Sequence, residues 1–183
     1  MKQLIVNNRI RLEQVKYTHA FQIFQAIDQN RGFLSKWLPF VEQTHTQEDT
    51  ESFIRSVLAV PGDEREDVFV IWYQDRFAGL IGLKDTDRQN MKTEIGYWLI
   101  EKMTGKGIMK RSVEVLLSYL FMNTQMNRIQ IKCGVGNEKS AAIPKRLGFH
   151  FEGVERDGEK HQNGFIDLEV YSIVRREWAK KSG

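Results

Sequence analysis

Two periodicities of apolar and polar residues divide the chain into short predicted elements. Apolar residues alternate with polar ones over residues 128–135, where Ile129, Ile131 and Cys133 share one face, and this period predicts a strand. Over residues 108–122 the apolar residues recur every three to four positions, which predicts an amphipathic helix. The same reasoning predicts one kinked opening strand over residues 4–12, further strands at 68–73, 77–84, 94–100, 149–155 and 165–175, and a short helix at 137–147 that ends before Gly148.

Two more helices are predicted between the opening strand and the strand at 68–73. Thr18 has the residue type of an N-cap for the first of them. Thr46 opens the second, with Asp49 three residues later in a position like that of a capping box. The expected apolar faces consist of Phe21, Phe24 and Ile27 in the first helix, and of Phe53, Ile54, Val57 and Leu58 in the second.

The order of these elements indicates the fold class. It runs strand, two helices, three strands, helix, strand, helix and two strands. Adjacent strands together with strand–helix–strand units predict an α+β fold, in which one mixed, mostly antiparallel sheet of six to seven strands has helices on both faces. No repeat, low-complexity segment or linker interrupts residues 1–183, so we expect a single domain.

Composition and charge narrow the possible partners and the compartment. The net charge is only +3 and the basic residues are dispersed, so nothing calls for direct binding of nucleic acid. The chain contains one cysteine, Cys133, which cannot form an internal disulfide and indicates a reducing compartment. Its thiol is either buried and structural or catalytic. The basic residues near the C-terminus are interpreted as a solvated helix end; they are Arg175, Arg176, Lys180 and Lys181.

Nothing in the sequence suggests membrane insertion or secretion. The N-terminal apolar stretch turns polar at Asn7, and no apolar run approaches the ~20 residues of a membrane span. We therefore expect a cytoplasmic protein. No spacing of side chains suggests a metal site.

The segment Thr104-Gly105-Lys106-Gly107-Ile108-Met109-Lys110 carries the strongest chemical signal. It connects a predicted strand to the amphipathic helix, whose N-terminus presents unpaired backbone N–H groups and partial positive charge. Gly105 and Gly107 allow an anion to approach these groups closely, while Lys106 and Lys110 add positive charge. The segment is either a phosphate-binding loop or a tight turn. It matches neither a P-loop, since Gly107 follows Lys106, nor a Rossmann fingerprint, since Lys110 replaces the third glycine.

This loop resembles motif A of the Gcn5-related N-acetyltransferases (GNAT), which reads Gln/Arg-x-x-Gly-x-Gly/Ala. Gly107 matches the central glycine, whereas Thr104 and Met109 replace the first and last residues of the motif. Residues 94–99 resemble the preceding strand of that family. Downstream, residues 137–141, 147–149 and 152–153 resemble the family's Asn-x-x-Ser and Leu-Gly-Phe-x-x-Glu-Gly signatures.

The resemblance implies a GNAT fold and acetyl-coenzyme A (acetyl-CoA) as cosubstrate. Backbone N–H groups of the glycine loop would hold the pyrophosphate. The strands at 94–100 and 128–135 would diverge, and pantetheine would pair with the first of them as an extra strand. Asn137 would hydrogen-bond pantetheine, or be only the N-cap of its helix, or do both. The implied cofactor-binding residues are Leu99, Ile100, Thr104, Gly105, Lys106, Gly107, Ile108, Met109, Lys110, Asn137 and Ser140.

The resemblance also implies direct attack of a neutral amine on the thioester, without a covalent enzyme intermediate. Ser140 would give a proton to the leaving thiolate, and Glu94 or Glu159 would act as the general base; each could instead be an ordinary polar residue. Trp37, Tyr97 and His161 are candidate substrate contacts. For Trp98 we expect a place in the core.

A narrower resemblance suggests the acceptor. Trp37-Leu38-Pro39, the loop at 105–109 and the closing Asn163-Gly164, Asp167 and Tyr171 are similar to the ribosomal-protein N-terminal acetyltransferases. The expected acceptor is therefore the N-terminal α-amine of a ribosomal protein. Three alternatives remain: an acetyltransferase of a small amine (antibiotic, polyamine or amino acid), a non-catalytic regulator that binds acyl-CoA or a nucleotide, and an RNA-binding accessory protein. A homo-oligomer is also left open.

Overall fold

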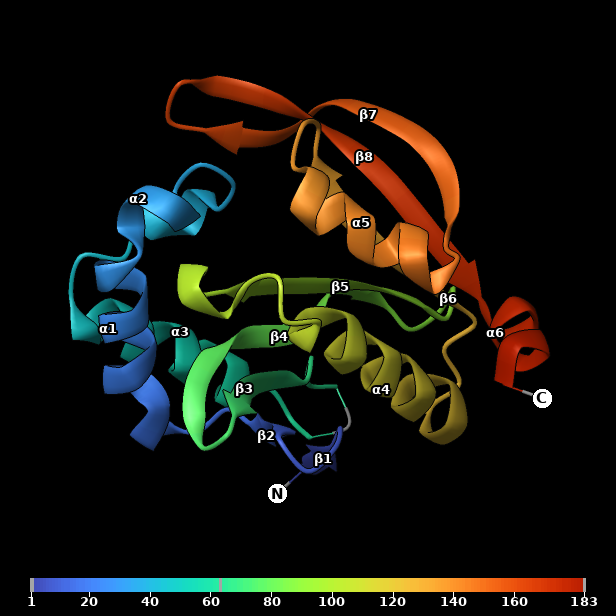
Figure 1. Ribbon diagram of the computed structural model, residues 1–183, viewed down its shortest axis with the longest axis horizontal. Coiled ribbons are helices and arrows are strands. Elements are labelled where there is room, and N and C mark those ends of the chain that lie inside the picture. Colours follow the sequence, from blue (N-terminus) through green and yellow to red (C-terminus); the bar gives the residue numbers. More distant parts are fainter. Residues whose placement is uncertain (1, 63, 183) are drawn as a thin grey trace. The chain divides into compact units, whose positions relative to one another are not determined.

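The computed structural model describes residues 2–62 and 64–182, which contain eight strands and six α-helices (Figure 1). The strands form one sheet in the order β1-β2-β3-β4-β5-β6-β8-β7. β5 and β6 are parallel, and the other described registers are antiparallel. The strands are β1 (Gln3–Ile5), β2 (Ile10–Gln14), β3 (Val68–Tyr73), β4 (Arg76–Asp87), β5 (Lys92–Leu99), β6 (Arg128–Gly134), β7 (His150–His161) and β8 (Gly164–Val174).

The mixed, mostly antiparallel sheet of the α+β prediction is confirmed. It has one strand more than expected, because the kinked opening strand is a hairpin of two strands, β1 and β2. The helices are α1 (Ala20–Gln29), α2 (Arg31–Leu34), α3 (Gln47–Ala59), α4 (Ile108–Asn123), α5 (Glu138–Leu147) and α6 (Arg175–Ser182), with 3₁₀ turns η1 (Tyr17–His19), η2 (Pro39–Glu42) and η3 (Glu101–Met103).

The chain forms two compact units. The first comprises the chain up to Gly82 together with Tyr97–Ser112, and the second comprises Leu83–Gly96 together with the chain from Val113 onward. Strands β4 and β5 and helix α4 therefore each contribute residues to both units. Within the described residues no helix is long and apolar enough to cross a membrane.

In the first unit, local sequence signals set the ends of several elements. Gln74 and Asp75 both adopt positive φ, of 49° and 60°, and form the tight turn between β3 and β4. Thr46 is the N-cap of α3: its backbone N–H donates to Asp49 Oδ2 at 2.8 Å, and the Asp49 N–H donates to Thr46 Oγ1 at 3.4 Å. The predicted capping box is thus confirmed. Helices α1 and α3 lie side by side (Figure 1).

The predicted start and apolar face of the first helix were partly wrong. Thr18 lies inside the 3₁₀ turn η1, and α1 begins only at Ala20. Phe21 lies two residues before the buried Ile23, about 200° around a helix of 3.6 residues per turn, and is 53% exposed. On α3, Phe53 is 41% exposed. The buried residues of these two helices include Ile23, Ala26, Ile27 and Ile54.

In the second unit, β8 lies between β6 and β7. Gly148, with φ of 70°, ends α5 as predicted. β7 is longer than the strand predicted at 149–155, since it continues to His161 and pairs with β8 as far as Gly164. Two register shifts, between Phe151 and Gly153 and between Glu155 and Glu159, interrupt this long hairpin. The basic residues near the C-terminus lie in a helix, α6, as interpreted, but Arg175 begins this helix and is not part of a solvated helix end.

Arg175 connects the C-terminal end of α4 to the start of α6. Its guanidinium donates to the Phe121 carbonyl, to the Thr124 carbonyl at 2.8 Å and to the Met126 carbonyl at 2.6 Å, and it also lies over the Phe121 ring. A helix C-terminus leaves carbonyl groups without intrahelical partners, and a cation is favoured there. Arg175 therefore caps α4.

Candidate active site

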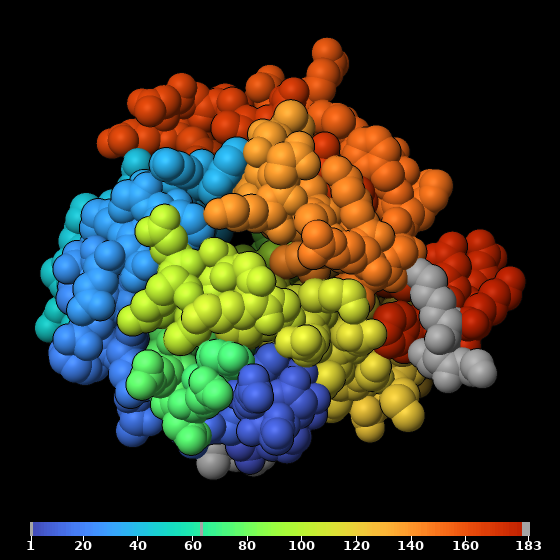
Figure 2. Space-filling view, in the orientation of Figure 1, coloured from blue at the N-terminus to red at the C-terminus, as the bar shows by residue number. Residues whose placement is uncertain are grey.

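The glycine loop that leads into α4 has the backbone that its sequence requires. Gly105 and Gly107 adopt φ of 74° and 70°, a region that other residues reach only with strain. A Cβ at Gly105 would meet nothing within 4 Å, and one at Gly107 would meet the Arg111 guanidinium at 3.3 Å. Figure 2 shows this yellow-green segment at the surface beside the green β3–β4 turn. Open space therefore lies beside Gly105, whereas the Arg111 guanidinium lies beside Gly107.

The loop side chains divide into two groups. Ile108 and Met109 are buried, and with Val113, Leu116 and Leu117 they confirm the predicted apolar stripe of α4. Lys106 is exposed, and its Nζ lies 5.8 Å from the centroid of the Tyr73 ring. The first-turn N–H groups of α4 lack intrahelical partners by the geometry of a helix. Backbone donors and a lysine ammonium therefore occur in one short segment.

The end of β5 is held by close backbone packing within the first unit. The Ile100 N–H donates to the Ala78 carbonyl at 2.9 Å, and the Ile100 carbonyl accepts from the Met103 N–H at 3.0 Å. Both backbone groups of Ile100 are thus engaged. Gly79 permits this packing, since a Cβ there would lie 2.0 Å from the Trp98 carbonyl oxygen. Of the other candidates at this end, Leu99 and Tyr97 are half-buried.

The parallel pairing of β5 with β6 covers only the first part of β5. The described register runs from Lys92 opposite Arg128 to Glu94 opposite Gln130. β5 then continues to Leu99 and β6 to Gly134. The described pairing of the two strands therefore ends at Glu94, and their divergence beyond it stays a prediction. A strand edge beyond such a point offers N–H and C=O groups to an extended amide.

Glu94 is the most buried of the candidate catalytic residues, with 2% of its surface exposed. Its Oε1 lies 2.8 Å from Lys84 Nζ, and its Oε2 accepts from Gln130 Nε2 at 3.1 Å. Burial alone would lower the pKa of Lys84, but the charge of Glu94 and the hydrogen bond to it outweigh this effect and raise that pKa. Both oxygens of Glu94 are therefore committed to partners.

Asn137 and Ser140 lie together at the start of α5. Asn137 is the N-cap, and its Oδ1 accepts from the Ser140 N–H at 3.2 Å. Ser140 Oγ lies 3.3 Å from Cys133 Sγ, within the distance at which either group can donate to the other. Cys133 is buried, as the alternating pattern of β6 predicts. The N-cap interpretation of Asn137 is confirmed, and its contact with pantetheine stays a prediction.

Glu159 and His161 lie two residues apart near the end of β7. His161 Nε2 is 2.9 Å from Glu159 Oε2, with side-chain exposures of 13% and 32% respectively. Glu159 follows the second register shift of the β7–β8 hairpin and lies opposite Ile166. Its charge also contributes to raising the pKa of Lys84. Glu159 is thus a partly exposed carboxylate with a histidine beside it.

Trp37 lies between α2 and η2, and its N–H donates to the Leu34 carbonyl at 3.1 Å. Arg31 donates to the Val41 and Thr44 carbonyls, the latter at 2.8 Å, and forms an ion pair with Asp28 at 3.1 Å. Trp37 itself is half-buried. Trp98 is 8% exposed, which confirms its expected place in the core.

Three residues that contact or support the candidates were missed from the sequence: Lys84, Gln130 and Arg31. Lys84 and Gln130 reach Glu94 from neighbouring strands, so only the strand register brings the three together. Arg31 contacts carbonyl groups ten and thirteen residues later, and backbone acceptors leave no trace in a sequence. Among the described residues no group of three or more His, Cys, Asp or Glu side chains could hold a metal ion.

The described residues include a glycine loop before a helix, a pair of parallel strands, a hydroxyl at a helix start and a carboxylate with some exposure. Residues 9–150 match the family described as the acetyltransferase (GNAT) domain. The chain therefore belongs to the GNAT acetyltransferases and is an acyltransferase.

Particular relatives cover almost the whole chain. YdaF of Bacillus subtilis (strain 168), provisionally named a ribosomal N-acetyltransferase, is 35% identical over 94% of this chain and 95% of its own. The ribosomal-protein-serine acetyltransferase of Escherichia coli (strain K12) is 26% identical over 92% of this chain and 94% of its own. The crystal structure of the microcin C7 self-immunity acetyltransferase MccE in complex with acetyl-CoA and AMP is similar with a TM-score of 0.86, at 30% identity over 92% of this chain and 94% of that one.

Proposed function

We propose that the protein is a cytoplasmic N-acetyltransferase that transfers the acetyl group of acetyl-CoA to the N-terminal α-amine of a protein, with a ribosomal protein as the expected acceptor. The observation that carries this proposal is the glycine loop before α4, whose two glycines adopt positive φ over a helix N-terminus. Relatives named as acetyltransferases of ribosomal proteins, at 26% and 35% identity, support the choice of acceptor.

The loop residues fit the phosphate groups of acetyl-CoA. The backbone N–H groups of this loop would point toward the phosphate, so a side chain at Gly105 or Gly107 would lie close to it. The space beside Gly105 is open. We assign the pyrophosphate to the backbone N–H groups of Gly105, Gly107, Ile108 and Met109, with Lys106 and Lys110 adding positive charge. When bound, acetyl-CoA supplies a thioester that an amine can attack directly.

Glu159 is our choice for the general base. Glu94 has both oxygens engaged by Lys84 and Gln130, so taking up a proton would cost it an ion pair and a hydrogen bond. Glu159 is more exposed, and His161 holds its Oε2. Such a carboxylate can accept a proton from an incoming ammonium, directly or through water.

Ser140 is our choice for the proton donor. Its hydroxyl is half-buried, and its N–H is held by the N-cap side chain of Asn137, which fixes the residue in the first turn of α5. The neighbouring Cys133 thiol, at 3.3 Å, can in turn hydrogen-bond this hydroxyl. Ser140 would therefore be kept in place to protonate a leaving thiolate, and no nucleophilic side chain is required.

The pKa of the acceptor amine favours an α-amine over a lysine. An unperturbed α-amine has a pKa of about 7.7–8.0, so roughly a tenth is neutral at pH 7, whereas for a lysine with a pKa of about 10.4 the neutral fraction is roughly four in ten thousand. The difference corresponds to about 3 kcal/mol of activation free energy. Glu159 is partly exposed, and as a base it would need to lower the activation free energy much less for an α-amine than for a lysine.

The experiment is mass spectrometry of ribosomal proteins after incubation with the enzyme and acetyl-CoA. The proposal predicts a gain of one acetyl group at a protein N-terminus. Acetylation of internal lysines only, or of a small amine such as spermidine only, would refute the assigned acceptor. If none of these acceptors leads to release of coenzyme A thiol, the alternative of a non-catalytic regulator would be favoured.

A further inference from the structure

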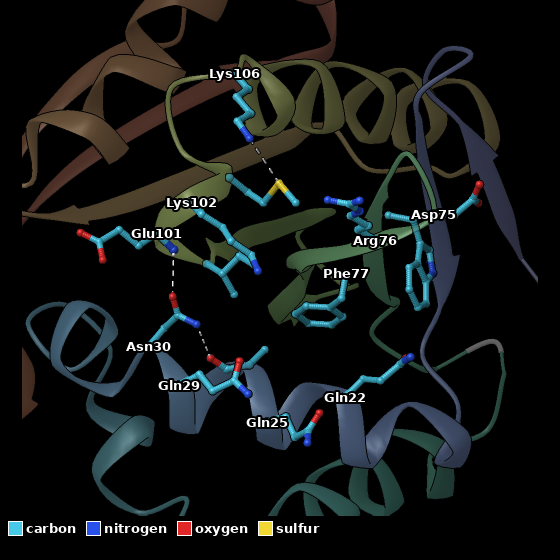
Figure 3. A pocket seen from close by; sticks show the side chains of 14 residues that line it. Gln22, Gln25, Gln29, Asn30, Asp75, Arg76, Phe77, Glu101, Lys102 and Lys106 are labelled. Atoms are coloured by element: carbon cyan, nitrogen blue, oxygen red, sulfur yellow. Dashed lines mark hydrogen bonds between the residues drawn. The ribbon is translucent and has the colours of Figure 1, made fainter.

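A groove of about 680 Å³ lies beside the glycine loop, within the first unit (Figure 3). Its walls come from three places: helix α1, the turn between β3 and β4, and the stretch from Ile100 through η3 to Lys106. The volume is within the range of ligand-binding sites. Of the residues assigned a role above, only Ile100 and Lys106, both toward the cosubstrate, line this groove.

One wall of the groove carries a row of carboxamides. Gln22, Gln25 and Gln29 lie on α1, Asn30 follows its last residue, and all four line the groove, one after another in Figure 3. Asn30 is fixed at both ends: its Nδ2 donates to the Ala26 carbonyl at 2.8 Å, and its Oδ1 accepts from the Glu101 N–H at 3.1 Å. Each carboxamide offers both a donor and an acceptor, as a peptide group does.

The other walls carry positive charge. Arg76 of β4, Lys102 of η3 and Lys106 of the glycine loop are exposed, and Figure 3 shows their charged ends turned toward the groove. Of the two carboxylates in the lining, Asp75 is neutralised by an ion pair with Arg11, which leaves Glu101. The groove therefore has a surplus of positive charge.

The floor of the groove is apolar but offers no open aromatic face. Ile100 and Met103 are 5% and 4% exposed, and Trp72 is 9% exposed. Phe77, the other aromatic residue of the lining, is half-buried. Single-stranded nucleic acids are bound by a basic groove together with aromatic rings on which bases stack. The carboxamide row and the covered rings favour a peptide over RNA as the anionic ligand.

We propose that this groove is a docking site for an acidic segment of the acceptor polypeptide. The backbone amides of the segment would lie along the α1 carboxamides, and its carboxylates would contact Arg76 and Lys102. That the acceptor is a polypeptide rests on the proposed function. The groove continues into the glycine loop at Lys106, so a docked segment lies next to the loop assigned to the cosubstrate. Charge complementarity of this kind gives selectivity among acceptors and faster association.

The test measures binding directly, without acetyl-CoA, so that it does not depend on acetyl transfer. The probe is a fluorescein-labelled eight-residue peptide of alternating Glu and Gly, and fluorescence anisotropy gives its Kd. The double variant Arg76→Glu/Lys102→Glu should weaken binding by ~10-fold or more, because each contact with an exposed cation becomes a repulsion. Arg9→Glu/Arg55→Glu, which makes the same change in net charge at exposed positions outside the groove, should leave Kd within about twofold.

Two further comparisons separate a peptide from other anions. The double variant Gln25→Ala/Gln29→Ala should weaken binding of the peptide several-fold. It should leave unchanged the inhibition constant of inorganic pyrophosphate, measured as a competitor of the labelled peptide. Three outcomes would each overturn the proposal. The two charge-reversal variants could weaken binding equally, or a Gln-Gly peptide of the same length could bind with the same affinity as the acidic peptide. The third is displacement of the labelled peptide by an eight-nucleotide oligo-uridine at a lower concentration than by the unlabelled acidic peptide. Thermal unfolding checks that every variant is folded.

Activity measurements keep this proposal distinct from the proposed function. For an acceptor peptide with an acidic segment, Arg76→Glu/Lys102→Glu should raise KM by ~10-fold at unchanged kcat, and for a short neutral peptide it should change neither. If the acidic probe binds in the groove but no N-terminus is acetylated, the docking site stands and the proposed acceptor fails. If N-termini are acetylated but the reversal leaves the KM of the acidic acceptor unchanged, the docking site fails alone.

Discussion

Lys84 Nζ lies 2.8 Å from Glu94 Oε1, and this ion pair, together with Gln130, occupies a carboxylate that is 2% exposed. The pair decides between two candidate bases. Glu159→Gln should lower kcat by ~10²-fold or more, the usual contribution of a positioned general base. Glu94→Gln should change kcat much less and mainly alter stability, because it leaves the Lys84 ammonium without its partner. Steady-state kinetics and thermal unfolding of both variants make the comparison. Loss of kcat in Glu94→Gln alone would reverse the assignment.

Gly107→Val should abolish binding of acetyl-CoA while the protein still folds. A β-branched residue is strained at a φ of 70°, and its side chain extends from the segment that must approach the pyrophosphate. Isothermal titration calorimetry measures the affinity. Gly32→Ala is the control, since a Cβ there meets nothing within 4 Å and no positive φ is required. Equal affinity of Gly107→Val and the wild type would remove the phosphate-binding role of the loop.

Ser140→Ala should lower kcat by ~10²-fold or more and change the Kd of acetyl-CoA far less. The reason is that proton donation is needed in the transition state and not for binding. Ser118→Ala is the matched control, because the Ser118 hydroxyl donates to the Glu114 carbonyl within α4 and Ser118 has no proposed role. Turnover at the wild-type rate in Ser140→Ala would reduce Ser140 to a structural residue of α5.

Gly79→Ala should destabilise the protein by about 3 kcal/mol, in the range of overpacked core substitutions. The added Cβ would lie 2.0 Å from the Trp98 carbonyl oxygen and 2.8 Å from Leu99 Cα, both backbone atoms that cannot move aside as a flexible side chain can. Denaturant unfolding measures the loss. If Gly79→Ala unfolds at the same denaturant concentration as Gly32→Ala, the close approach of β4 to β5 is not a constraint on stability.

His19 should make stability depend on pH in the mildly acidic range. Burial lowers its pKa, Glu13 opposes this effect, and Lys16 adds to it; Trp72 packs edge-on against the ring. The unfolded chain therefore binds the proton first, so the contribution of His19 is complete above a pH of about 6.5 and is lost as pH falls through the folded pKa. In His19→Gln, the free energy of unfolding should fall less between pH 7 and pH 5 than in the wild type. An identical slope in both proteins would contradict the buried, neutral state of His19.

Local signals in the sequence were sufficient where a single element determines its own ends. The stripe of α4, the Thr46 capping box and the stop at Gly148 each depend on residues within one turn of each other. They were predicted correctly for that reason. The conformation of the glycine loop also depends on local residues, because its two glycines lie next to the start of α4.

Elements that depend on a distant partner were not predictable in this way. The stretch at 156–161 is polar and contains Gly158, so it was interpreted as a loop. Its pairing with β8, in which Glu159 lies opposite Ile166, makes it a strand. The same limit applies to the site, since the partners of Glu94 come from β4 and β6 and only the register of the sheet brings them to it.

The Arg175 cap of α4 places a constraint on the order in which the chain can fold during its synthesis. The carbonyl groups that it binds belong to residues made 49 to 54 positions earlier. Until Arg175 has been synthesised, the C-terminal end of α4 must be satisfied by water, and β6 also lacks its antiparallel neighbour β8. Contacts so distant in sequence form slowly and late. The second unit can therefore be completed only after Arg175 has been synthesised, whereas all residues of the first unit precede Val113, as expected where domains fold during synthesis.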